Sequence, residues 1–175
     1  MICGEKDFVR IKGLLYYNNE LQSRIETAKG KSKKNMKKAF LRAKERISNL
    51  VSELHKKIAK WLCENYSEIY IPRLNFHTLK NLDSTSKSIL ASLRHCEFVN
   101  RIIHKSNSYK NCKVIEVNEA YTSMTCGECG YQNQDLGTDK IFDCKECKSI
   151  IGRDINASRN IMLRYITKTF KLKLV

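Results

Sequence analysis

The sequence predicts an α/β domain into which a four-cysteine metal ribbon is inserted. Short apolar runs typical of strands alternate with longer stretches in which apolar residues recur at spacings of three and four, and this alternation favours the α/β class. Two cysteine hooks, CGEC beginning at Cys126 and CKEC beginning at Cys144, predict the ribbon. The 175 residues are enough for one compact domain with a small insertion.

Two short apolar stretches near Phe8 and Leu14 are interpreted as weak strands. The clearest helix follows over 35–64, where ten apolar residues form one stripe. This stripe predicts a core-facing helix, which could pack on a sheet or pair in a heptad dimer. Trp61, which lies on the stripe, is expected to be a packing residue rather than a base-stacking one.

Two more strands and two more helices are expected in the rest of the chain. Ile69–Ile71 is typical of a short buried strand, which Pro72 ends because proline cannot donate to the ladder. A second helix is predicted over 86–104, a second strand over Lys113–Val117 and a last helix over about 155–166.

The composition is that of an ordinary folded protein, with 42% hydrophobic and 29% charged residues. No apolar run approaches the roughly 18 residues that a membrane span needs. The first ten residues carry Glu5 and Asp7 and contain no apolar stretch after a basic start, so they do not resemble a signal peptide. We therefore expect an intracellular protein in which thiols stay reduced and clustered cysteines bind metal.

The net charge of +15 at pH 7 favours a polyanionic partner, either nucleic acid or an anionic membrane surface. Lysine, isoleucine and asparagine are all abundant, however, and an AT-rich genome would raise the lysine content without any binding role. We favour nucleic acid. The lysine-rich stretch 28–38 is either a solvated helix start or a phosphate-contacting patch, with Lys33, Lys34, Lys37 and Lys38 as candidate contacts.

The two cysteine hooks are separated by fourteen residues. A two-residue gap within each hook lets both thiolates point at one ion at about 2.3 Å. Gly127 and Gly130 are expected to allow the tight turn around the metal. Two hooks complete a tetrahedral shell, so the ion is a structural zinc and local folding depends on it. The predicted zinc ligands are Cys126, Cys129, Cys144 and Cys147.

Two carboxylates, Glu119 and Asp154, flank the ribbon in the sequence. Metal-bound hooks would draw the segments on either side of the ribbon together and could place these two side chains next to each other. Adjacent carboxylates repel unless a cation lies between them, and such a pair can hold Mg²⁺ for phosphodiester hydrolysis. The alternative is ordinary: Asp154 caps the last helix, and Glu119 is a surface residue.

Three segments together resemble the C-terminal part of the TnpB proteins of insertion sequences and of their Fanzor relatives. These segments are 121–130, the CKEC hook at Cys144, and 153–161, which begins RDINA. Type V CRISPR effectors share the same nuclease domain. Residues 69–76 and the helix that contains Arg94 and His95 also resemble the family, so the resemblance covers nearly the whole chain.

The resemblance implies an incomplete RNase H-like (RuvC) domain. Residues 1–118 would form a partial RuvC-like region with the helical segment 35–64, residues 119–150 the zinc ribbon, and residues 151–175 the C-terminal RuvC helix and tail. Family members are RNA-guided DNA endonucleases that hold catalytic Mg²⁺ with three carboxylates. DNA and a guide RNA are therefore the implied partners, and Asp154 falls on the last catalytic aspartate.

Two positions depart from the family pattern. Pro72 stands where the bacterial proteins have a catalytic glutamate, whereas the Fanzor-like branch carries it near the Tyr-Thr-Ser motif. Glu119 fits that relocated position better than Glu116. The first catalytic aspartate lies in an Asp-x-Gly strand, but Asp7 is not followed by glycine at the required place.

We therefore expect a truncated, transposon-associated nuclease domain that is inactive alone. A zinc-ribbon module that binds nucleic acid without catalysis is one alternative, and Arg153 joins the lysines as a candidate contact. A protein-interaction module, whose long helix pairs with a partner, is another.

Overall fold

The computed structural model describes most of the chain. The described residues are 4–73, 83–119, 121–134, 137 and 139–173. The family-like segment 69–76 is therefore described only as far as Arg73, and the C-terminal tail only as far as Lys173. The chain divides into two compact units, which comprise residues 1–69 with 74–114 and residues 70–73 with 115–175.

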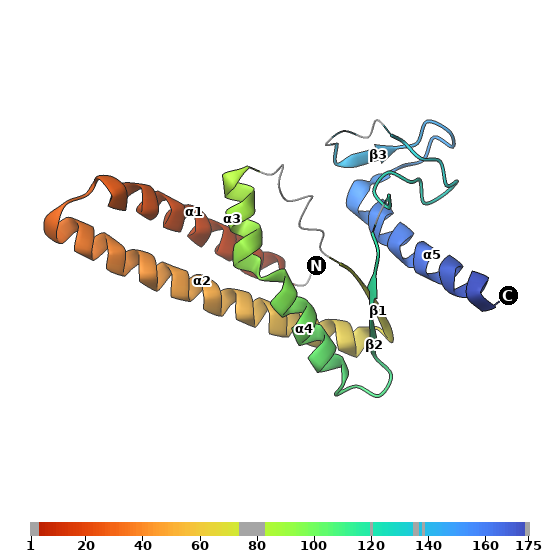
Figure 1. Cartoon of the computed structure of the whole chain (residues 1–175), viewed down its shortest axis with the longest axis horizontal. Coiled ribbons are helices and arrows are strands. Elements are labelled where there is room, and N and C mark those ends of the chain that lie inside the picture. The colour runs from red at the N-terminus through yellow and green to blue at the C-terminus, as the bar shows by residue number, and fades with distance from the viewer. Residues whose placement is uncertain (1–3, 74–82, 120, 135–136, 138, 174–175) are drawn as a thin grey trace. The chain divides into compact units, whose positions relative to one another are not determined.

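A long helical hairpin dominates the first unit. Helix α1 (Glu5–Thr27) and helix α2 (Gly30–Asn65) lie antiparallel, side by side, and are joined by a two-residue turn (Figure 1). Their shared core consists of the buried residues Ile11, Leu15, Ile47, Val51 and Leu54. Side chains in such a core stabilise the hairpin because their apolar surface is removed from water.

The prediction of the long helix is confirmed, although α2 begins several residues before the predicted segment 35–64. Its apolar stripe packs on α1 of the same chain, not on a sheet. Trp61 remains 41% exposed and makes an edge contact with Tyr66, with ring centroids 5.5 Å apart.

The prediction of strands near Phe8 and Leu14 is wrong, because both residues lie in α1. The buried positions Ile11, Leu15 and Leu21 follow the helical period, and their packing on α2 overrides the local strand preference.

The predicted helix 86–104 is two helices, α3 (Ser84–Leu93) and α4 (His95–Ser106). Arg94 separates them in a left-handed conformation with φ 47° and ψ 57°. The carbonyl oxygen of Leu93 lies 2.9 Å from Nε2 of His55, a buried residue of α2. This contact fastens the break to the hairpin.

The two strands predicted before the ribbon are confirmed. Strand β1 (Glu68–Pro72) and strand β2 (Lys113–Val117) form a two-stranded sheet. The Lys113 N–H donates to the Ser67 carbonyl over 2.8 Å, and the Arg73 N–H donates to the Val117 carbonyl over 3.1 Å. Both strands therefore run in the same direction, with α3 and α4 in the crossover between them.

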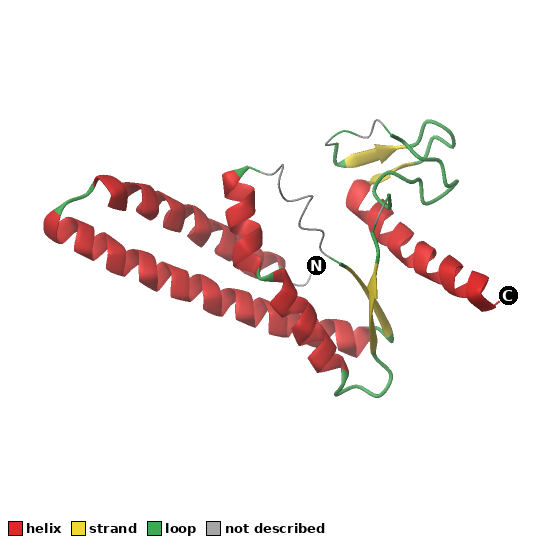
Figure 2. Ribbon diagram, viewed as in Figure 1, coloured by secondary structure: helices red, strands yellow, loops and turns green. Residues whose placement is uncertain are grey.

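The second unit contains the cysteine ribbon and the last helix. Strand β3 (Ile141–Asp143) and strand β4 (Ile150–Gly152) form an antiparallel hairpin, and helix α5 (Arg153–Lys173) follows directly (Figure 2). Phe142 pairs with Ile151 and is completely buried in the ribbon core. The chain thus combines helices with short strands, as the α/β class predicts. No described helix combines the length and apolar character that a membrane crossing requires.

Candidate metal centre and the helix that holds it

The four predicted zinc ligands meet at one point in the structure. The sulfur atoms of Cys126, Cys129, Cys144 and Cys147 all lie within 4.8 Å of one another. Cys126 and Cys147 are 3.7 Å apart, and Cys129 and Cys144 are 3.6 Å apart. Four thiolates about 2.3 Å from a tetrahedral ion would be separated by about 3.8 Å. The cluster therefore has the dimensions of a four-thiolate zinc site.

Backbone hydrogen bonds close each hook into a compact turn. In the first hook the Gly130 N–H donates to the Cys126 carbonyl over 2.9 Å, and in the second the Lys148 N–H donates to the Cys144 carbonyl over 2.9 Å. Gly130 and Lys148 both have positive φ, at 78° and 61°. The expectation for Gly130 is therefore met, because a left-handed turn requires this conformation there.

The electrostatics of the cluster favour a bound cation. Burial raises the pKa of the Cys144 thiol, but N–H groups of Cys147 and Glu146 and the neighbouring thiols outweigh it and lower this pKa to about 7. For Cys147 the Ser149 N–H lowers the pKa, yet burial and the three neighbouring thiols raise it to about 12. Four thiolates this close together repel one another unless a cation lies between them. A divalent metal removes this conflict by displacing their protons.

Two asparagines of α5 attach the first hook to the helix. The Asn156 amide accepts a hydrogen bond from the Gly127 N–H over 2.9 Å and donates to the Thr125 carbonyl over 2.7 Å. The Asn160 amide donates to the carbonyls of Thr122 and Thr125 over 2.9 and 2.6 Å. Positions four apart lie on one side of a helix, so the two amides act together. Both side chains are buried, with 1% and 7% exposure.

Gly127 is needed for this contact rather than for a left-handed turn. A Cβ atom on Gly127 would lie 3.0 Å from Oδ1 of Asn156 and 3.2 Å from Oδ1 of Asn160. An ion pair between Glu128 and Arg159 adds to the attachment. The contacts of Asn156 and Asn160 were not predicted from the sequence, although two asparagines four positions apart directly after the ribbon are a usable signal.

The two candidate catalytic carboxylates border the ribbon. Asp154 is exposed in the first turn of α5, where the helix dipole favours an acidic side chain. The Glu119 carbonyl accepts hydrogen bonds from the N–H and hydroxyl of Thr122, which closes a turn before the first hook. In the described part of the chain, the four cysteines form the only group of three or more possible metal-ligating side chains. A magnesium site shared by Glu119 and Asp154 remains a prediction.

The candidate nucleic-acid contacts fall into two settings. Arg153 donates to the Gly137 carbonyl over 3.1 Å, and its backbone N–H donates to the Lys140 carbonyl over 2.9 Å, so it closes a ribbon loop. The lysine candidates lie at the start of α2 in the other unit, where Lys33 is half-buried. The exposed ones are Lys34, Lys37 and Lys38.

A family model described as Cas12f1-like, TNB domain matches residues 95–161, which extend from α4 through the ribbon into α5. TnpB-like protein L79 of Acanthamoeba polyphaga mimivirus is 30% identical over 160 residues, which cover 89% of this chain and 30% of that relative. This chain is related to the TnpB and type V CRISPR effector family. The resemblance stated from its motifs is thereby confirmed.

The TnpB-related chain is also similar to the CRISPR-associated endodeoxyribonuclease Cas12f1 of Sulfoacidibacillus thermotolerans. The identity is 26% over 128 residues, which cover 71% of this chain and 30% of that protein. A chain in the cryo-EM structure of the Cas12f1-sgRNA-target DNA complex shares the fold, with a TM-score of 0.56 and 24% identity over 85% of this chain and 41% of that one. The chain thus spans about a third of the length of these curated relatives.

Proposed function

We propose that this chain acts as a transposon-associated, DNA-binding domain of TnpB-like nuclease ancestry. It would comprise an incomplete RNase H-like (RuvC) region over 1–118, a zinc ribbon over 119–150 and a RuvC helix with its tail over 151–175. The observation that carries the proposal is the attachment of the four-thiol site to α5 through Asn156 and Asn160. This contact connects the ribbon to α5, whose first turn carries Asp154, the residue that we propose as the catalytic aspartate.

Zinc suits the thiol cluster because its four ligands leave no open position for a substrate. Its role would be structural: the ion would hold the two hooks against each other and so support the start of α5. Mg²⁺ would instead bind oxygen ligands, for which we propose Glu119 and Asp154. The competing residue Glu116 is engaged, since its carboxylate accepts from Nε of Arg73 over 2.8 Å.

We propose that DNA is the principal partner and that a guide RNA takes part. The similar Cas12f1 protein forms a complex with an sgRNA and target DNA. In the RuvC reading, Glu119 and Asp154 would bind Mg²⁺ and position it against a phosphate of the DNA. Two-metal hydrolysis requires both ions to be clamped, and two carboxylates are few ligands for that task. We therefore propose that these residues alone support binding rather than cleavage.

Thermal unfolding of the zinc-loaded chain in Mg²⁺ or Mn²⁺ tests the carboxylate site. A ligand at 100 times its dissociation constant stabilises a protein by about 2.7 kcal/mol. Both ions should raise the melting temperature of the wild type, and Asp154→Ala should abolish that rise. Asp143→Ala removes another exposed carboxylate of the same unit and should keep it. Equal shifts in the wild type and both variants would refute the shared site.

A further inference from the structure

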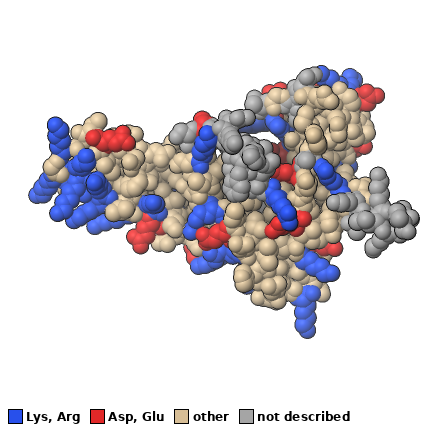
Figure 3. Space-filling view, viewed as in Figure 1, with Lys and Arg blue, Asp and Glu red and all other residues tan. Residues whose placement is uncertain are grey.

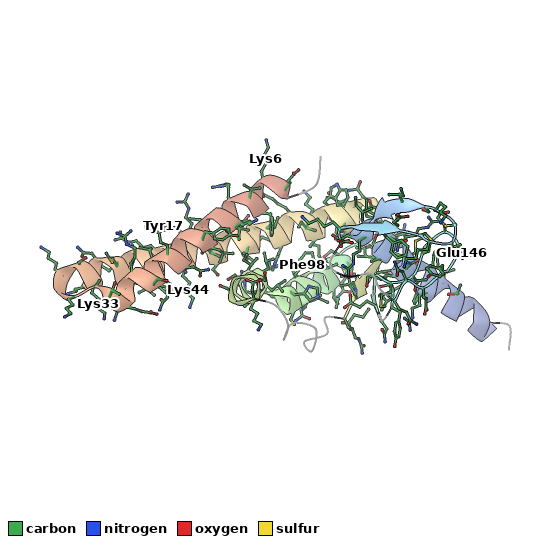
Figure 4. All side chains as sticks on the ribbon, turned by 90° about the horizontal axis from the view of Figure 1, so that it is seen from above. Lys6, Tyr17, Lys33, Lys44, Phe98 and Glu146 are labelled. Carbon is green, nitrogen blue, oxygen red and sulfur yellow. The ribbon has the colours of Figure 1, made fainter. Side chains whose placement is uncertain are left out.

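The turn-proximal part of α2 carries an unusual concentration of positive charge. Between Lys29 and Lys44 there are eight cations and no carboxylate; we call this segment the basic tip. Figure 3 shows Lys and Arg side chains gathered where α1 and α2 are joined, and Figure 4 labels Lys33 close to that turn. Seven of the eight cations are exposed, and Lys33 is half-buried. The cations are Lys29, Lys31, Lys33, Lys34, Lys37, Lys38, Arg42 and Lys44.

The charges of the basic tip are not neutralised within the hairpin. In the part of the chain that the structure describes, none of the eight cations makes an ion pair. At the other end of α2, three lysines do make ion pairs. These are Lys56 with Glu53, Lys57 with Asp7 and Lys60 with Glu64, at 2.7, 2.8 and 3.7 Å. The positive charges of α2 are therefore paired with carboxylates at its C-terminal end but not in the basic tip.

Helical geometry arranges the tip cations in rows. Lys31, Lys34, Lys38 and Arg42 follow spacings of three and four and so form one row, on the side of α2 away from the buried Ala43. With a rise of 1.5 Å per residue, this row extends over about 16 Å. Duplex DNA carries one phosphate per strand every 3.4 Å or so, and the row therefore matches about five base pairs.

The basic tip itself is poor in aromatic groups, on which separated bases would stack. Phe40 is the only aromatic residue between Lys29 and Lys44, and it is half-buried. On the facing helix Tyr16 and Tyr17 are 52% and 48% exposed, and the Lys12 ammonium lies 5.9 Å from the centre of the Tyr16 ring. Single-strand binding usually relies on open aromatic faces on which bases stack. Within the basic tip, eight cations stand against one half-buried aromatic residue, and this composition favours the phosphates of an intact duplex.

We propose that the basic tip is a sequence-independent grip for the phosphate backbone of duplex nucleic acid. The proposal rests on the nucleic-acid-binding function proposed above and assigns one contact surface for it. This surface lies in the hairpin unit and consists of side chains separate from the thiol cluster. Its affinity comes from the release of counterions, so it should depend steeply on salt and little on sequence.

Two triple variants of the full zinc-loaded chain provide the test. The first carries Lys34→Gln, Lys37→Gln and Lys38→Gln in the basic tip. The matched control carries Lys56→Gln, Lys57→Gln and Lys60→Gln, which remove the same charge from the ion-paired end of the same helix. Fluorescence anisotropy would follow binding to two unrelated DNA duplexes between 50 and 200 mM salt, and circular dichroism would verify folding.

We expect the tip variant to reduce the slope of log affinity against log salt by about 2.7, at about 0.9 per lysine, for both sequences. The control should change the slope by less than 1. A variant with Lys31→Gln and Arg42→Gln, which lie in one row with Lys34 and Lys38, should reproduce the effect at about 1.8. An equal loss in tip and control variants would overturn the proposal, because net charge alone would then explain binding.

Other ligands separate the remaining possibilities. A duplex RNA whose slope falls equally would support recognition of phosphates rather than of the sugar. Stronger tip-dependent binding to single-stranded DNA, or to vesicles that contain phosphatidylserine, would overturn the duplex assignment. If the wild type bound no duplex at all, the nucleic-acid function proposed above would fail as well. Binding by the wild type with an unchanged tip variant would refute the grip alone.

Discussion

At the scale of single residues, the side chain of Asn156 makes the most consequential contact. Its amide satisfies one donor and one acceptor of the first cysteine hook, and it is 1% exposed. A buried polar group that loses its partner costs free energy because it was already removed from water. The Asn156 amide is therefore needed for the packing of the first cysteine hook against α5.

Replacing Asn156 by alanine should destabilise the second unit by about 2–4 kcal/mol, since it strands the Gly127 N–H and the Thr125 carbonyl. Asn156→Asp keeps an acceptor for Gly127 but buries a carboxylate against the Thr125 carbonyl oxygen, so its loss of stability should be at least as large. Urea unfolding of the zinc-loaded protein would measure both. Ser158→Ala, at an exposed position of the same helix, is the control and should change stability little. Similar stabilities for all three variants would argue against the asparagine contact.

Replacing glycine by alanine should have opposite effects on stability at Gly127 and at Gly13. At Gly127 an added Cβ would press on Asn156 Oδ1 at 3.0 Å, so Gly127→Ala should destabilise the ribbon. At Gly13, within α1, no atom of the described residues lies within 4 Å of the added atom. Gly13→Ala should therefore stabilise the hairpin by about 0.8 kcal/mol through helix propensity. Thermal unfolding of both variants checks the two signs, and a gain at both positions would contradict the close packing at Gly127.

At the scale of elements, the break between α3 and α4 depends on a buried histidine. Nε2 of His55 lies 2.9 Å from the Leu93 carbonyl, and the ring lies 5.1 Å from that of Phe98. Among the described residues, Nδ1 of His55 has no hydrogen-bond partner. The neutral ring can therefore donate to Leu93 through Nε2 and leave Nδ1 unprotonated in its buried site.

Burial lowers the pKa of His55, and Arg94 and Arg101 lower it further. The hydrogen bond to Leu93 and the nearby Glu97 raise this pKa, but their effect is smaller than that of burial. The unfolded chain therefore takes up the proton first as the pH falls. The neutral His55 side chain makes its full contribution to stability above about pH 6.5. This contribution is lost as the pH falls from there towards the lowered pKa of His55 in the folded chain.

We therefore expect the hairpin unit to become less stable between pH 7.5 and 5.5. His55→Gln retains a donor for Leu93 without the titration, so its urea midpoint should vary less over this range. His104→Gln, at an exposed site on α4, should keep the wild-type dependence. A wild-type pH profile in His55→Gln would assign the acid sensitivity to other groups.

The apolar pattern of each element decides whether the sequence predicts that element. Helix α2 has a continuous apolar stripe, and β1 and β2 are compact apolar runs, so their patterns were unambiguous. Helix α1 was missed because its stripe is interrupted by Asn18 and accompanied by exposed Tyr16 and Tyr17. The break at Arg94 was missed because neither glycine nor proline marks it, and it depends on the distant His55.

In the candidate site too, features set by local spacing could be predicted from the sequence, whereas contacts between distant residues could not. The cysteine cluster followed from spacing alone, because each two-residue gap is a local constraint. The asparagine contacts span 29 to 38 positions in the sequence, and only the folded chain reveals them. The reason for Gly127 was equally hidden, since its neighbour across the contact lies on α5.

At the scale of the whole molecule, the two units have separate cores. The hairpin core consists of residues of α1 and α2, whereas the ribbon core contains Phe142 and two cysteines of the cluster, Cys126 and Cys144. A small core of this kind is insufficient without the metal, and structural zinc contributes about 10 kcal/mol or more to comparable sites. Metal should therefore control the folding of one unit and not of the other.

Removing zinc should unfold the ribbon and leave the hairpin folded. After chelation, or in Cys144→Ser, hydrogen exchange should lose protection at Gly127 and Phe142 but retain it at Val51, which is fully buried between α1 and α2. Cys96→Ser, at an exposed cysteine outside the cluster, is the matched control and should retain protection in both units. Loss of protection at Val51 together with the ribbon would show that the units fold as one. Retained protection at Phe142 without metal would remove the structural role of zinc, and with it the support that the ribbon gives to the start of α5.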